Sequence, residues 1–465
     1  MAKNIKNNFW AFFQEISKIP RESENEKGIA DYIENFAKER NLKYVRDELH
    51  NIVIYKDATD EARKDEVIAL QGHQDMVCQK TKESKHNFLT DPIEIIKEKD
   101  IVKALDTTLG ADNGMGVSFM LSILDSKDIK HPNLECIFTV QEETSMKGAL
   151  NLPFDKIKTK RIISLDNEED DKICIGSMGI REYNAERKVT ETSISGKDVY
   201  ELEFYNFKGG HSGIDIKDKT RTNTNKLLAN TLRDLNVYLI DINGGTKANA
   251  IPYETKAIFA IDSEDVSKLK DRIEELKNSN LYGKMKFVKL DNNYSKAITK
   301  EDSKEVIDCI LEYRNGVLEQ NSDGALLTSN FGVMSRKGDV IEIIVSFRNK
   351  VVSLAENFTA EMKELYNKHG FKLTYIDEYP AYETKGTNDL IEKSAAIYEK
   401  MFGKKVTVES VEGALECGAF AFNIEGVEFI AIGPNIHNAH SVDEYVEIES
   451  ANNMYKYTIE LLENL

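Results

Sequence analysis

The sequence predicts an α/β protein built from a discontinuous domain with a mostly parallel sheet flanked by helices, and an inserted α+β domain with an antiparallel sheet. Short apolar runs alternate with amphipathic helical stretches at both ends of the chain, which is typical of a parallel sheet. The middle of the chain instead alternates apolar and polar residues, as half-exposed antiparallel strands do. The chain has 465 residues, more than one hydrophobic core usually holds.

The N-terminal part of the chain supplies most of the expected parallel strands. Apolar spacing predicts the helices, and short buried runs predict the strands. The expected elements are helices over 8–19 and 25–40, a strand over 51–55, a strand from Val67 that ends at His73, a small hairpin within 80–105, a helix opened by the glycine-rich turn at 108–116, and strands over 136–140 and 162–165.

The middle of the chain, residues 187–382, is expected to form the inserted domain. Residues 199–204 and 340–345 alternate as antiparallel strands do, and the helices expected between them suggest an internal duplication with a second set from about 263. The first texture returns after Tyr379-Pro380, so residues 1–186 and 383–465 are assigned to one domain. This last part holds a helix over 388–402 and strands over 406–408 and 429–432.

The composition limits the partners of the protein. The formal net charge is −18, so a nucleic acid or an anionic membrane is not expected as a partner, because such surfaces require basic excess. Five cysteines without CxxC spacing indicate free thiols in a reducing compartment. Since no apolar run is long enough to span a bilayer and no signal peptide is evident, we expect a soluble cytoplasmic protein.

Potential ligand residues follow four of the buried strands. The residues that close these strands are His73 with Asp75, Glu142 with Glu143, Asp166, and His440. In open α/β sheets, ligands bind beyond the carboxyl ends of the strands, so these side chains are expected to converge on one site. Asp112 joins them from the glycine-rich turn at a helix start, although an aspartate there is equally explained as a helix N-cap.

The residue types suit two divalent ions and hydrolysis. Three carboxylates and two neutral imidazoles leave one positive charge on two dications, which a bridging hydroxide would cancel. Mixed nitrogen and oxygen ligands favour zinc, with manganese or cobalt as alternatives. Of the adjacent Glu142 and Glu143, one can bind metal and the other can act as general base and acid.

Several short motifs resemble one enzyme family along nearly the whole chain and in the order of the family. The sequence resembles the cocatalytic zinc aminopeptidases and amidohydrolases related to carboxypeptidase G and aminoacylase, and within them the aminoacyl-histidine dipeptidases (peptidase D, carnosinase-like). The motifs are His73-Gln74-Asp75-Met76-Val77, Leu109-Gly110-Ala111-Asp112-Asn113-Gly114, Gln141-Glu142-Glu143, Leu165-Asp166, Gly209-Gly210-His211-Ser212-Gly213, Asn249-Ala250-Ile251-Pro252, Gly413-Ala414-Leu415-Glu416-Cys417-Gly418, and Gly433-Pro434 followed by His440-Ser441.

The resemblance implies a role for each residue of the site. It assigns His73 and Asp166 to one metal and Glu143 and His440 to the other, with Asp112 bridging both through a residue whose link to Asn113 is a cis peptide in the family. It makes Asp75 the residue that orients His73, and Glu142 the general base.

The same resemblance makes residues 187–382 a lid domain. It implies that His211 stabilises the oxyanion and that Asn249 and Arg348 hold the substrate carboxylate, with Lys350 as a substitute for the arginine. Either Glu416 or Glu412 would receive the substrate amine, and Glu416 is preferred as nearer to the active-site motif. The resemblance would place a histidine at position 412, where this sequence has glutamate.

The resemblance implies a cytosolic dipeptidase with two Zn²⁺ ions (Mn²⁺ or Co²⁺ as alternatives), acting as monomer or homodimer. The expected substrates are dipeptides, preferably Xaa-His and including β-alanyl-histidine, cleaved by a zinc-bridging hydroxide. The same machinery acting on N-acyl amino acids is one alternative. A metal-binding protein without catalytic activity is an alternative of another class, and the intact Glu142 argues against it.

Overall fold

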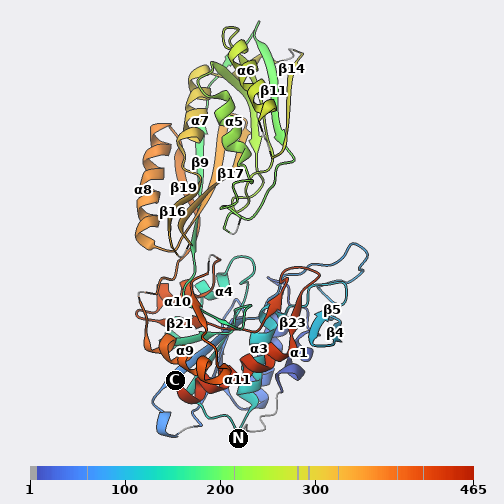
Figure 1. The fold of residues 1–465 in the computed structure, drawn as a ribbon, viewed down its shortest axis with the longest axis vertical. Helices are drawn as coiled ribbons and strands as arrows, with labels where there is room; N and C mark the ends of the chain where they lie inside the picture. The colour runs from blue at the N-terminus through green and yellow to red at the C-terminus, as the bar shows by residue number, and fades with distance from the viewer. Residues whose placement is uncertain are drawn as a thin grey trace. The chain divides into compact units, whose positions relative to one another are not determined.

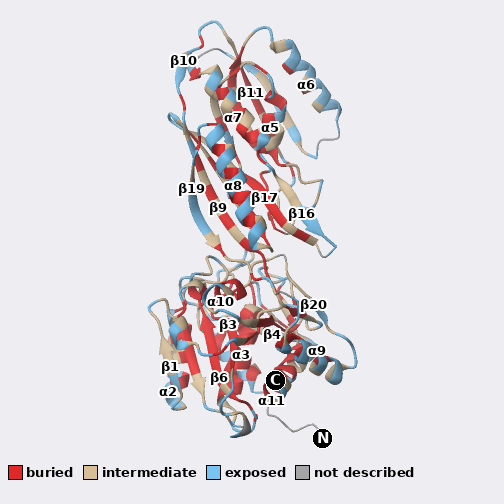
Figure 2. Cartoon of the chain, turned by 90° about the vertical axis from the view of Figure 1, so that its left-hand side faces the viewer, coloured by how far each residue is buried: buried red, intermediate tan, exposed pale blue. Residues whose placement is uncertain are grey.

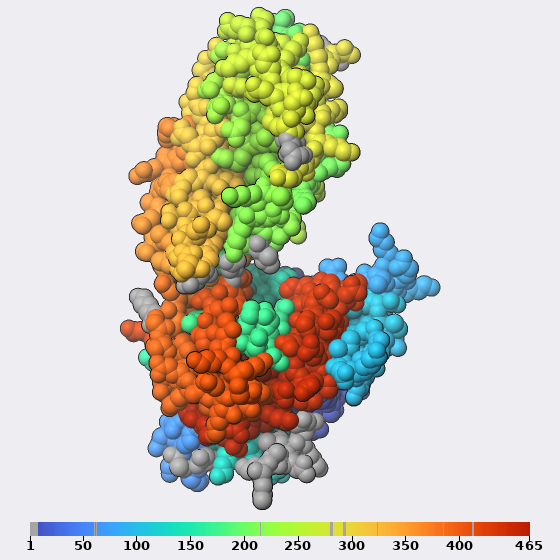
Figure 3. All heavy atoms as spheres, viewed as in Figure 1, coloured from blue at the N-terminus to red at the C-terminus, as the bar shows by residue number. Residues whose placement is uncertain are grey.

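The structure is a computed structural model that describes residues 8–59, 61–213, 215–279, 282–291, 294–322, 324–384, 386–411 and 413–465. The chain divides into two compact units. The first, unit 1, comprises the chain up to Ser177, then Tyr382–Val411 and Leu415–Leu465. The second, unit 2, is Met178–Ala381 with Gly413 and Ala414. In Figure 3 the blue-to-green atoms of the N-terminal segment and the orange-to-red atoms of the C-terminal segments lie together on the face of unit 1 that the view shows.

Unit 1 is a three-layer α/β domain around an eight-stranded sheet (Figure 1). The sheet order is β1-β2-β6-β3-β7-β21-β8-β20, and its central strands β6, β3, β7 and β21 run parallel to one another. The helices and strands of this unit are α1 (Phe9–Ile16), α2 (Lys27–Glu39), β1 (Lys43–Arg46), β2 (Ile52–Lys56), β3 (Val67–His73), β4 (Ile95–Glu98), β5 (Ile101–Ala104), α3 (Ala111–Asp125), β6 (Asn133–Thr139), α4 (Lys147–Leu150), β7 (Arg161–Ser164), β8 (Lys172–Cys174), α9 (Asp389–Phe402), β20 (Thr407–Glu409), α10 (Cys417–Asn423), β21 (Glu428–Ala431), β22 (Ile436–His437), β23 (Tyr445–Glu447) and α11 (Ile448–Asn464), with 3₁₀ turns at Glu61–Arg63 and Phe154–Lys156.

The central strands are buried on both faces, which explains their continuous apolar sequences. In β3, Ile68 and Leu70 join the core that α1, α2, α3, α9 and α11 cover, whereas Ala69 joins the smaller core beside α4 and α10. Successive side chains of a strand point to opposite faces, so both faces must be apolar where both are covered. Figure 2 shows β3 and β6 as buried strands inside the unit. This architecture confirms the predicted α/β class and the small hairpin, which is β4–β5.

Unit 2 is a mostly antiparallel sheet with helices packed on it. The long sheet has the order β14-β11-β13-β12-β17-β18-β9-β19, with β16 paired to β17. Its elements are β9 (Gly179–Lys188), β10 (Glu191–Ser193), β11 (Asp198–Tyr205), α5 (Thr224–Leu232), β12 (Val237–Gly244), β13 (Thr255–Ile261), α6 (Val266–Asn278), β14 (Lys284–Leu290), β15 (Lys296–Ile298), α7 (Lys300–Glu312), β16 (Gly316–Asn321), β17 (Gly324–Lys337), β18 (Val340–Asn349), α8 (Val352–Lys368) and β19 (Lys372–Tyr379).

The two halves of this sheet repeat one βαββαβ pattern. The first copy is β11-α5-β12-β13-α6-β14, and the second is β9-α7-β17-β18-α8-β19. Counted in chain order within each copy, both have the strand order 4-1-3-2 from the outer edge inward, and their second strands, β12 and β17, pair where the copies meet. This repetition agrees with the duplication expected from the sequence. The division between the copies does not fall at about 263 as expected. The whole first copy is inserted between β9 and α7 of the second copy.

Strand β9 explains why the inserted unit begins earlier than the boundary expected at 187. The strand pairs with both β18 and β19, so it belongs to the sheet of unit 2 although it directly follows β8 of unit 1. Its sequence carries Arg181, Glu182, Glu186 and Arg187 among the apolar positions, which hides the alternation.

Among the described residues, no helix has the length and apolar character needed to cross a membrane.

Glycines allow the two copies to approach closely where they meet. Gly245 has a positive φ of 72°, and a Cβ placed on it would lie 1.9 Å from the carbonyl oxygen of Gly332. Gly338, in the turn between β17 and β18, also has a positive φ, of 65°, but a Cβ there would meet no atom within 4 Å. Substitution of Gly338 therefore tests the strain of a left-handed backbone alone, whereas substitution of Gly245 tests that strain together with the close approach.

We expect Gly338→Ala to lower the free energy of unfolding by about 1 kcal/mol, the cost of placing a Cβ residue in the left-handed region. Gly245→Ala should lower it by a further ~1–3 kcal/mol, because the added methyl group must displace the Gly332 backbone. Chemical denaturation of both variants measures the difference. Equal losses would contradict a tight junction between the copies.

Candidate metal centre and active site

The candidate site lies at the carboxyl ends of the four central parallel strands of unit 1. His73 is the last residue of β3, Glu142 and Glu143 follow β6, Asp166 follows β7, and His440 lies on the segment after β21. These strands are neighbours in the sheet, so the chain segments that leave them meet at one edge. The convergence expected from the sequence is therefore what the sheet topology produces.

Asp112 lies between two groups of ligand atoms. Its Oδ1 lies 3.1 Å from His73 Nε2, which is also 3.6 Å from Asp166 Oδ1. Its Oδ2 lies 3.1 Å from His440 Nε2, which is 2.9 Å from Glu143 Oε2. Asp112 has extended rather than helical φ and ψ, and its peptide bond to Asn113 is cis. The two oxygens of Asp112 thus have different partners. Oδ1 faces His73, which is close to Asp166, and Oδ2 faces His440, which is close to Glu143.

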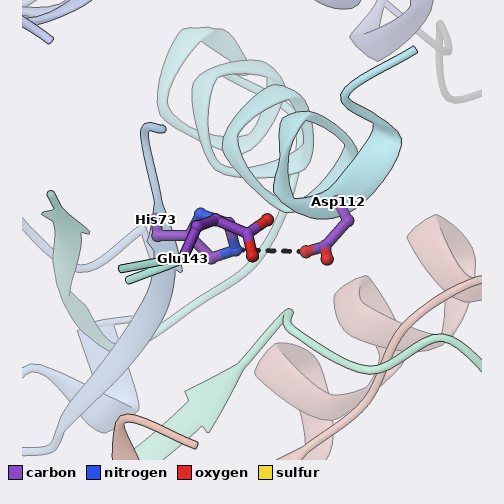
Figure 4. A group of neighbouring side chains, drawn as sticks. All are labelled: His73, Asp112 and Glu143. Atoms are coloured by element: carbon purple, nitrogen blue, oxygen red, sulfur yellow. Dashed lines mark hydrogen bonds and ion pairs between the residues drawn. The ribbon is translucent and has the colours of Figure 1, made fainter. Parts of the chain in front are cut away.

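This donor set fits metal ions. Ligand atoms of His73, Asp112 and Glu143 lie within 4.8 Å of one another, and Figure 4 shows the three side chains pointing toward one point. Glu143 Oε1 is buried and has no hydrogen-bond partner among the described residues, as expected for an oxygen that needs a cation. Two imidazoles and three carboxylates, divided about one bridging aspartate, match a two-ion site.

The ionisation of these groups reflects how many charges share a small buried volume. Burial, with repulsion from Asp112, raises the pKa of Glu143 to about 7. Hydrogen bonds to Asp112 and Glu143 raise the pKa of His440 to about 11. Burial opposes ionisation of Asp112, but hydrogen bonds from His440 and His73 lower its pKa below the usual range. Protons on the imidazoles therefore balance the carboxylates, a balance that a bound cation would take over.

Asp75 connects His73 to the loop that carries both glutamates. Asp75 is fully buried, and its Oδ1 lies 3.4 Å from His73 Nδ1. The same carboxylate accepts hydrogen bonds from the backbone N–H groups of Glu142 and Glu143, at 3.1 and 3.2 Å. A carboxylate behind a ligating histidine fixes the orientation of the ring, and here it also positions the two glutamates.

Glu142 lies beside the ligand cluster without belonging to it. Burial raises its pKa well above the usual value; the charge of His73 opposes this shift, and repulsion from Asp166 adds to it. A carboxyl group with such a raised pKa is suited to exchange a proton near neutral pH.

In unit 2, His211, Asn249 and Arg348 lie close together. Arg348 Nη2 lies 3.0 Å from His211 Nε2, and because arginine only donates, the neutral ring carries its proton on Nδ1. Burial and the charge of Arg348 lower the pKa of His211, which favours this neutral form. The loops of His211 and Asn249 pair through Ser212 N–H, which donates to Asn249 O at 2.9 Å. Lys350 lies just past the end of β18.

Arg348 is placed to bind an anion. It is 5% exposed, and burial lowers its pKa to about 10. Its Nε has no hydrogen-bond partner among the described residues. Gly213 packs against the guanidinium, since a Cβ there would lie 2.9 Å from Nε. A buried guanidinium with an unused donor is a typical site for a carboxylate.

Glu416 is buried at the sheet of unit 1, where one of its two oxygens accepts hydrogen bonds. It is 2% exposed, and its Oε2 accepts hydrogen bonds from the side chains of Gln71 and Thr139, on β3 and β6. Burial raises its pKa to about 8. These contacts hold Oε2 in the sheet interior, whereas Oε1 is buried and has no hydrogen-bond partner among the described residues, so the role of Glu416 in receiving the substrate amine stays a prediction. Glu412, the other residue considered, lies outside the described residues.

The sequence reading missed several polar residues that support the site. The Ser23 hydroxyl donates to Asp75 Oδ2 at 2.8 Å. In unit 2, the Asn330 amide donates to the carbonyl oxygens of Ala248 and Ala250, and so holds the loop of Asn249. A polar residue within an otherwise apolar strand, such as Gln71, is the signal that could have identified part of this set.

Comparison with known proteins places these motifs in one family. The model of peptidase family M20/M25/M40 matches residues 69–464. The chain is 32% identical over 472 residues to a protein of Escherichia coli (strain K12) named cytosol non-specific dipeptidase, covering 98% of this chain and 97% of the relative. The crystal structure of aminoacylhistidine dipeptidase from Vibrio alginolyticus matches with a TM-score of 0.86 and 28% identity, covering 99% and 97% of the two chains. A tripeptidase from Staphylococcus aureus subsp. aureus Mu50 matches in fold alone, with a TM-score of 0.61 and 14% identity over 98% and 97% of the chains.

We expect Glu416→Gln to stabilise the protein increasingly as the pH rises from 5 to 8. The folded protein keeps the Glu416 proton up to a pKa of about 8, whereas the unfolded chain loses it near the ordinary value of 4.5. Folded wild-type protein therefore binds more protons in this window and loses stability with rising pH, and the glutamine variant lacks this loss. The gain should reach about 1–4 kcal/mol at pH 8.

Chemical denaturation across the pH range measures this gain, with the exposed Glu39→Gln as the matched control. Parallel pH profiles for wild type and Glu416→Gln would contradict a buried, protonated Glu416.

Proposed function

The chain belongs to peptidase family M20/M25/M40, and on this premise we propose that it is a metal-dependent dipeptidase with two divalent ions in unit 1. The division of the ligands about the two oxygens of Asp112 is the observation that carries the proposal. The dipeptidase names of two relatives support the class of reaction, and the residues gathered in the candidate site suit each chemical task.

The five ligand residues would hold the two ions. His73 and Asp166 would bind one ion, Glu143 and His440 the other, and Asp112 would bridge them. Zinc suits this mixture of nitrogen and oxygen ligands, with manganese or cobalt as alternatives. When bound, such ions activate water as a nucleophile and polarise the carbonyl oxygen of the scissile bond.

Glu142 would transfer the proton. Its carboxylate would take a proton from the attacking water and deliver it to the nitrogen of the leaving amino acid. Asp75 would support this step. It accepts a hydrogen bond from the backbone N–H of Glu142, and its carboxylate lies beside the ring of His73, which it would orient. One buried carboxylate thus couples the position of the base to the position of a metal ligand.

The cluster in unit 2 would bind the substrate as a lid. His211 would stabilise the oxyanion that forms on the scissile carbonyl, through the proton it carries on Nδ1. Arg348, with its unused Nε donor, and Asn249 would hold the carboxylate of a short peptide. Recognition of a free carboxylate restricts the substrate to peptides whose C-terminus lies near the scissile bond.

The substrate class we propose is dipeptides, with Xaa-His and β-alanyl-histidine preferred. The Vibrio alginolyticus protein is named for aminoacyl-histidine substrates, whereas the Escherichia coli relative is named non-specific, so a panel must include other second residues. We also propose a cytoplasmic location, which the five cysteines without disulfides and the name of the Escherichia coli relative support.

We expect the purified protein to contain about two divalent ions per chain and to lose dipeptide hydrolysis when a chelator removes them. Elemental analysis and a panel of Xaa-His dipeptides, other dipeptides and N-acyl amino acids measure both quantities. Restoration by zinc, manganese and cobalt identifies the metal. Cleavage of acyl amino acids alone would move the function to deacylation, and activity that survives complete metal removal would contradict the proposal.

We expect Glu142→Gln to lower kcat by about 10²–10⁴-fold, because the amide cannot accept the proton, while the metal content stays at the wild-type value. The exposed Glu39→Gln serves as a control for loss of one carboxylate. Steady-state kinetics and elemental analysis of the same preparations give both readouts. Activity of Glu142→Gln equal to wild type would contradict its role as base.

A further inference from the structure

The carboxylate of Glu444 accepts hydrogen bonds from successive backbone N–H groups in the turn that precedes Asp112. Its Oε2 accepts hydrogen bonds from the N–H groups of Leu109 and Gly110, at 2.7 and 2.9 Å, and its Oε1 accepts one from Ala111 at 2.8 Å. The carboxylate is 3% exposed. Successive N–H groups that point to one place form a concave anion site, and here a side chain of the protein itself occupies it.

The place of Glu444 in the chain connects this turn to the loop of His440. Glu444 follows His440 by four residues and immediately precedes β23, which pairs with β5 in a separate small sheet. Its backbone N–H donates to Ser441 O at 3.2 Å, which closes the intervening turn. The position of one ligand loop is thus coupled to the position of the other through a single carboxylate.

Arg21 makes the corresponding connection from the other side of the same turn. It is 2% exposed, and its Nη1 donates to the carbonyl oxygens of Gln74 and Asp75, at 3.0 and 2.9 Å. Its Nη2 donates to the carbonyl oxygen of Gly110. Arg21 therefore joins the segment that carries His73 and Asp75 to the turn that carries Asp112.

Gly110 is held from both ends of its backbone. Its N–H donates to Glu444 and its C=O accepts from Arg21. Its φ is 69°, and a Cβ would lie 2.5 Å from Arg21 Nη2 and 2.7 Å from Met76 Sδ. Only glycine fits, so the turn before Asp112 is shaped to receive these two charged side chains.

We propose that Glu444 and Arg21 are positioning residues that hold three metal-ligand segments, at residues 73–75, 109–112 and 440–444, in register for metal binding. This inference rests on the proposed function of the ligand cluster. Both side chains act on the backbone of the ligand segments: Glu444 accepts from the N–H groups of residues 109–112, and Arg21 donates to the carbonyl oxygens of Gln74, Asp75 and Gly110.

The physical reason is preorganisation of Asp112. A bridging carboxylate must present its two oxygens to two ions at once, so a small rotation of the turn would weaken both sites together. Four N–H bonds to a buried carboxylate, the fourth from Asp112 itself at 3.5 Å, and three guanidinium bonds to carbonyl groups restrict that rotation. Hydrogen bonds to charged groups are stronger than neutral ones, and neither Glu444 nor Arg21 is exposed to competing water.

The experiment measures metal affinity directly, by competition with a chromogenic chelator for zinc, for wild type, Glu444→Gln and the matched control Asp443→Asn. Glutamine keeps the size of the side chain but places an NH₂ group against N–H donors. The Asp443→Asn variant removes the same charge at the exposed neighbour and leaves the hydrogen bonds of Glu444 to residues 109–111 in place. We expect Glu444→Gln to weaken zinc binding by about 10–100-fold and Asp443→Asn to leave it unchanged.

Hydrogen exchange of the metal-free proteins provides a second readout, independent of any activity. Residues 109–111 should exchange faster in Glu444→Gln than in Asp443→Asn, because their acceptor is lost. If Glu444→Gln does not fold, Glu444→Asp, which keeps the charge and shortens the side chain by one methylene, should bind zinc more weakly than wild type.

The outcomes separate this inference from the proposed function. Wild-type affinity for zinc together with wild-type exchange at 109–111 in Glu444→Gln would overturn the positioning role and leave the dipeptidase proposal standing. A wild-type protein that binds zinc but hydrolyses no peptide would overturn the proposed function, while weakened binding in Glu444→Gln would still support the positioning role.

Discussion

The constraint on which the site depends is the gathering of several carboxylates in a small volume with little water. Asp112, Glu143 and Asp166 share two histidines, and the charge of Asp166 also contributes to the raised pKa of Glu142 and of Glu416. Without compensation such groups would repel one another or take up protons. The protein compensates in two ways, with imidazoles placed between the carboxylates and with backbone N–H groups directed at the carboxylates that lie behind them.

This compensation depends on the parallel sheet. Four neighbouring strands deliver their carboxyl ends to one edge, and each then turns away from the sheet, leaving N–H groups that no strand partner uses. Asp75 takes two of these groups at the turn after β6. In the turn that follows the β4–β5 hairpin and opens α3, Glu444 likewise accepts hydrogen bonds from the N–H groups of residues 109–112. The ligands of the candidate metal centre are therefore held from behind by carboxylates that bind no metal themselves.

Unit 2 shows a different principle, in which a fold is enlarged by repeating one pattern. Two βαββαβ copies join through their second strands, and glycines at the junction let the backbones approach. The cluster of His211, Asn249 and Arg348 lies in this unit, with residues from both copies: His211 and Asn249 come from loops of the first copy and Arg348 from β18 of the second. The junction between the copies thus contributes to a site that neither copy would form alone.

The sequence by itself determined the fold class, the central strands and the residues that gather in the candidate site, because each buried strand is an apolar run followed by a residue that can bind metal, and such signals are local. It also indicated the duplication, through alternation that recurs. Tertiary structure decided what depends on residues distant in the chain. The strand order of the sheet, the charged alternation that hid β9, and the burial of Glu416 between Gln71 and Thr139 have no local signature. Arg21 and Glu444 are ordinary charged residues in the sequence, and only the fold brings them to opposite sides of Gly110, where burial makes their hydrogen bonds strong.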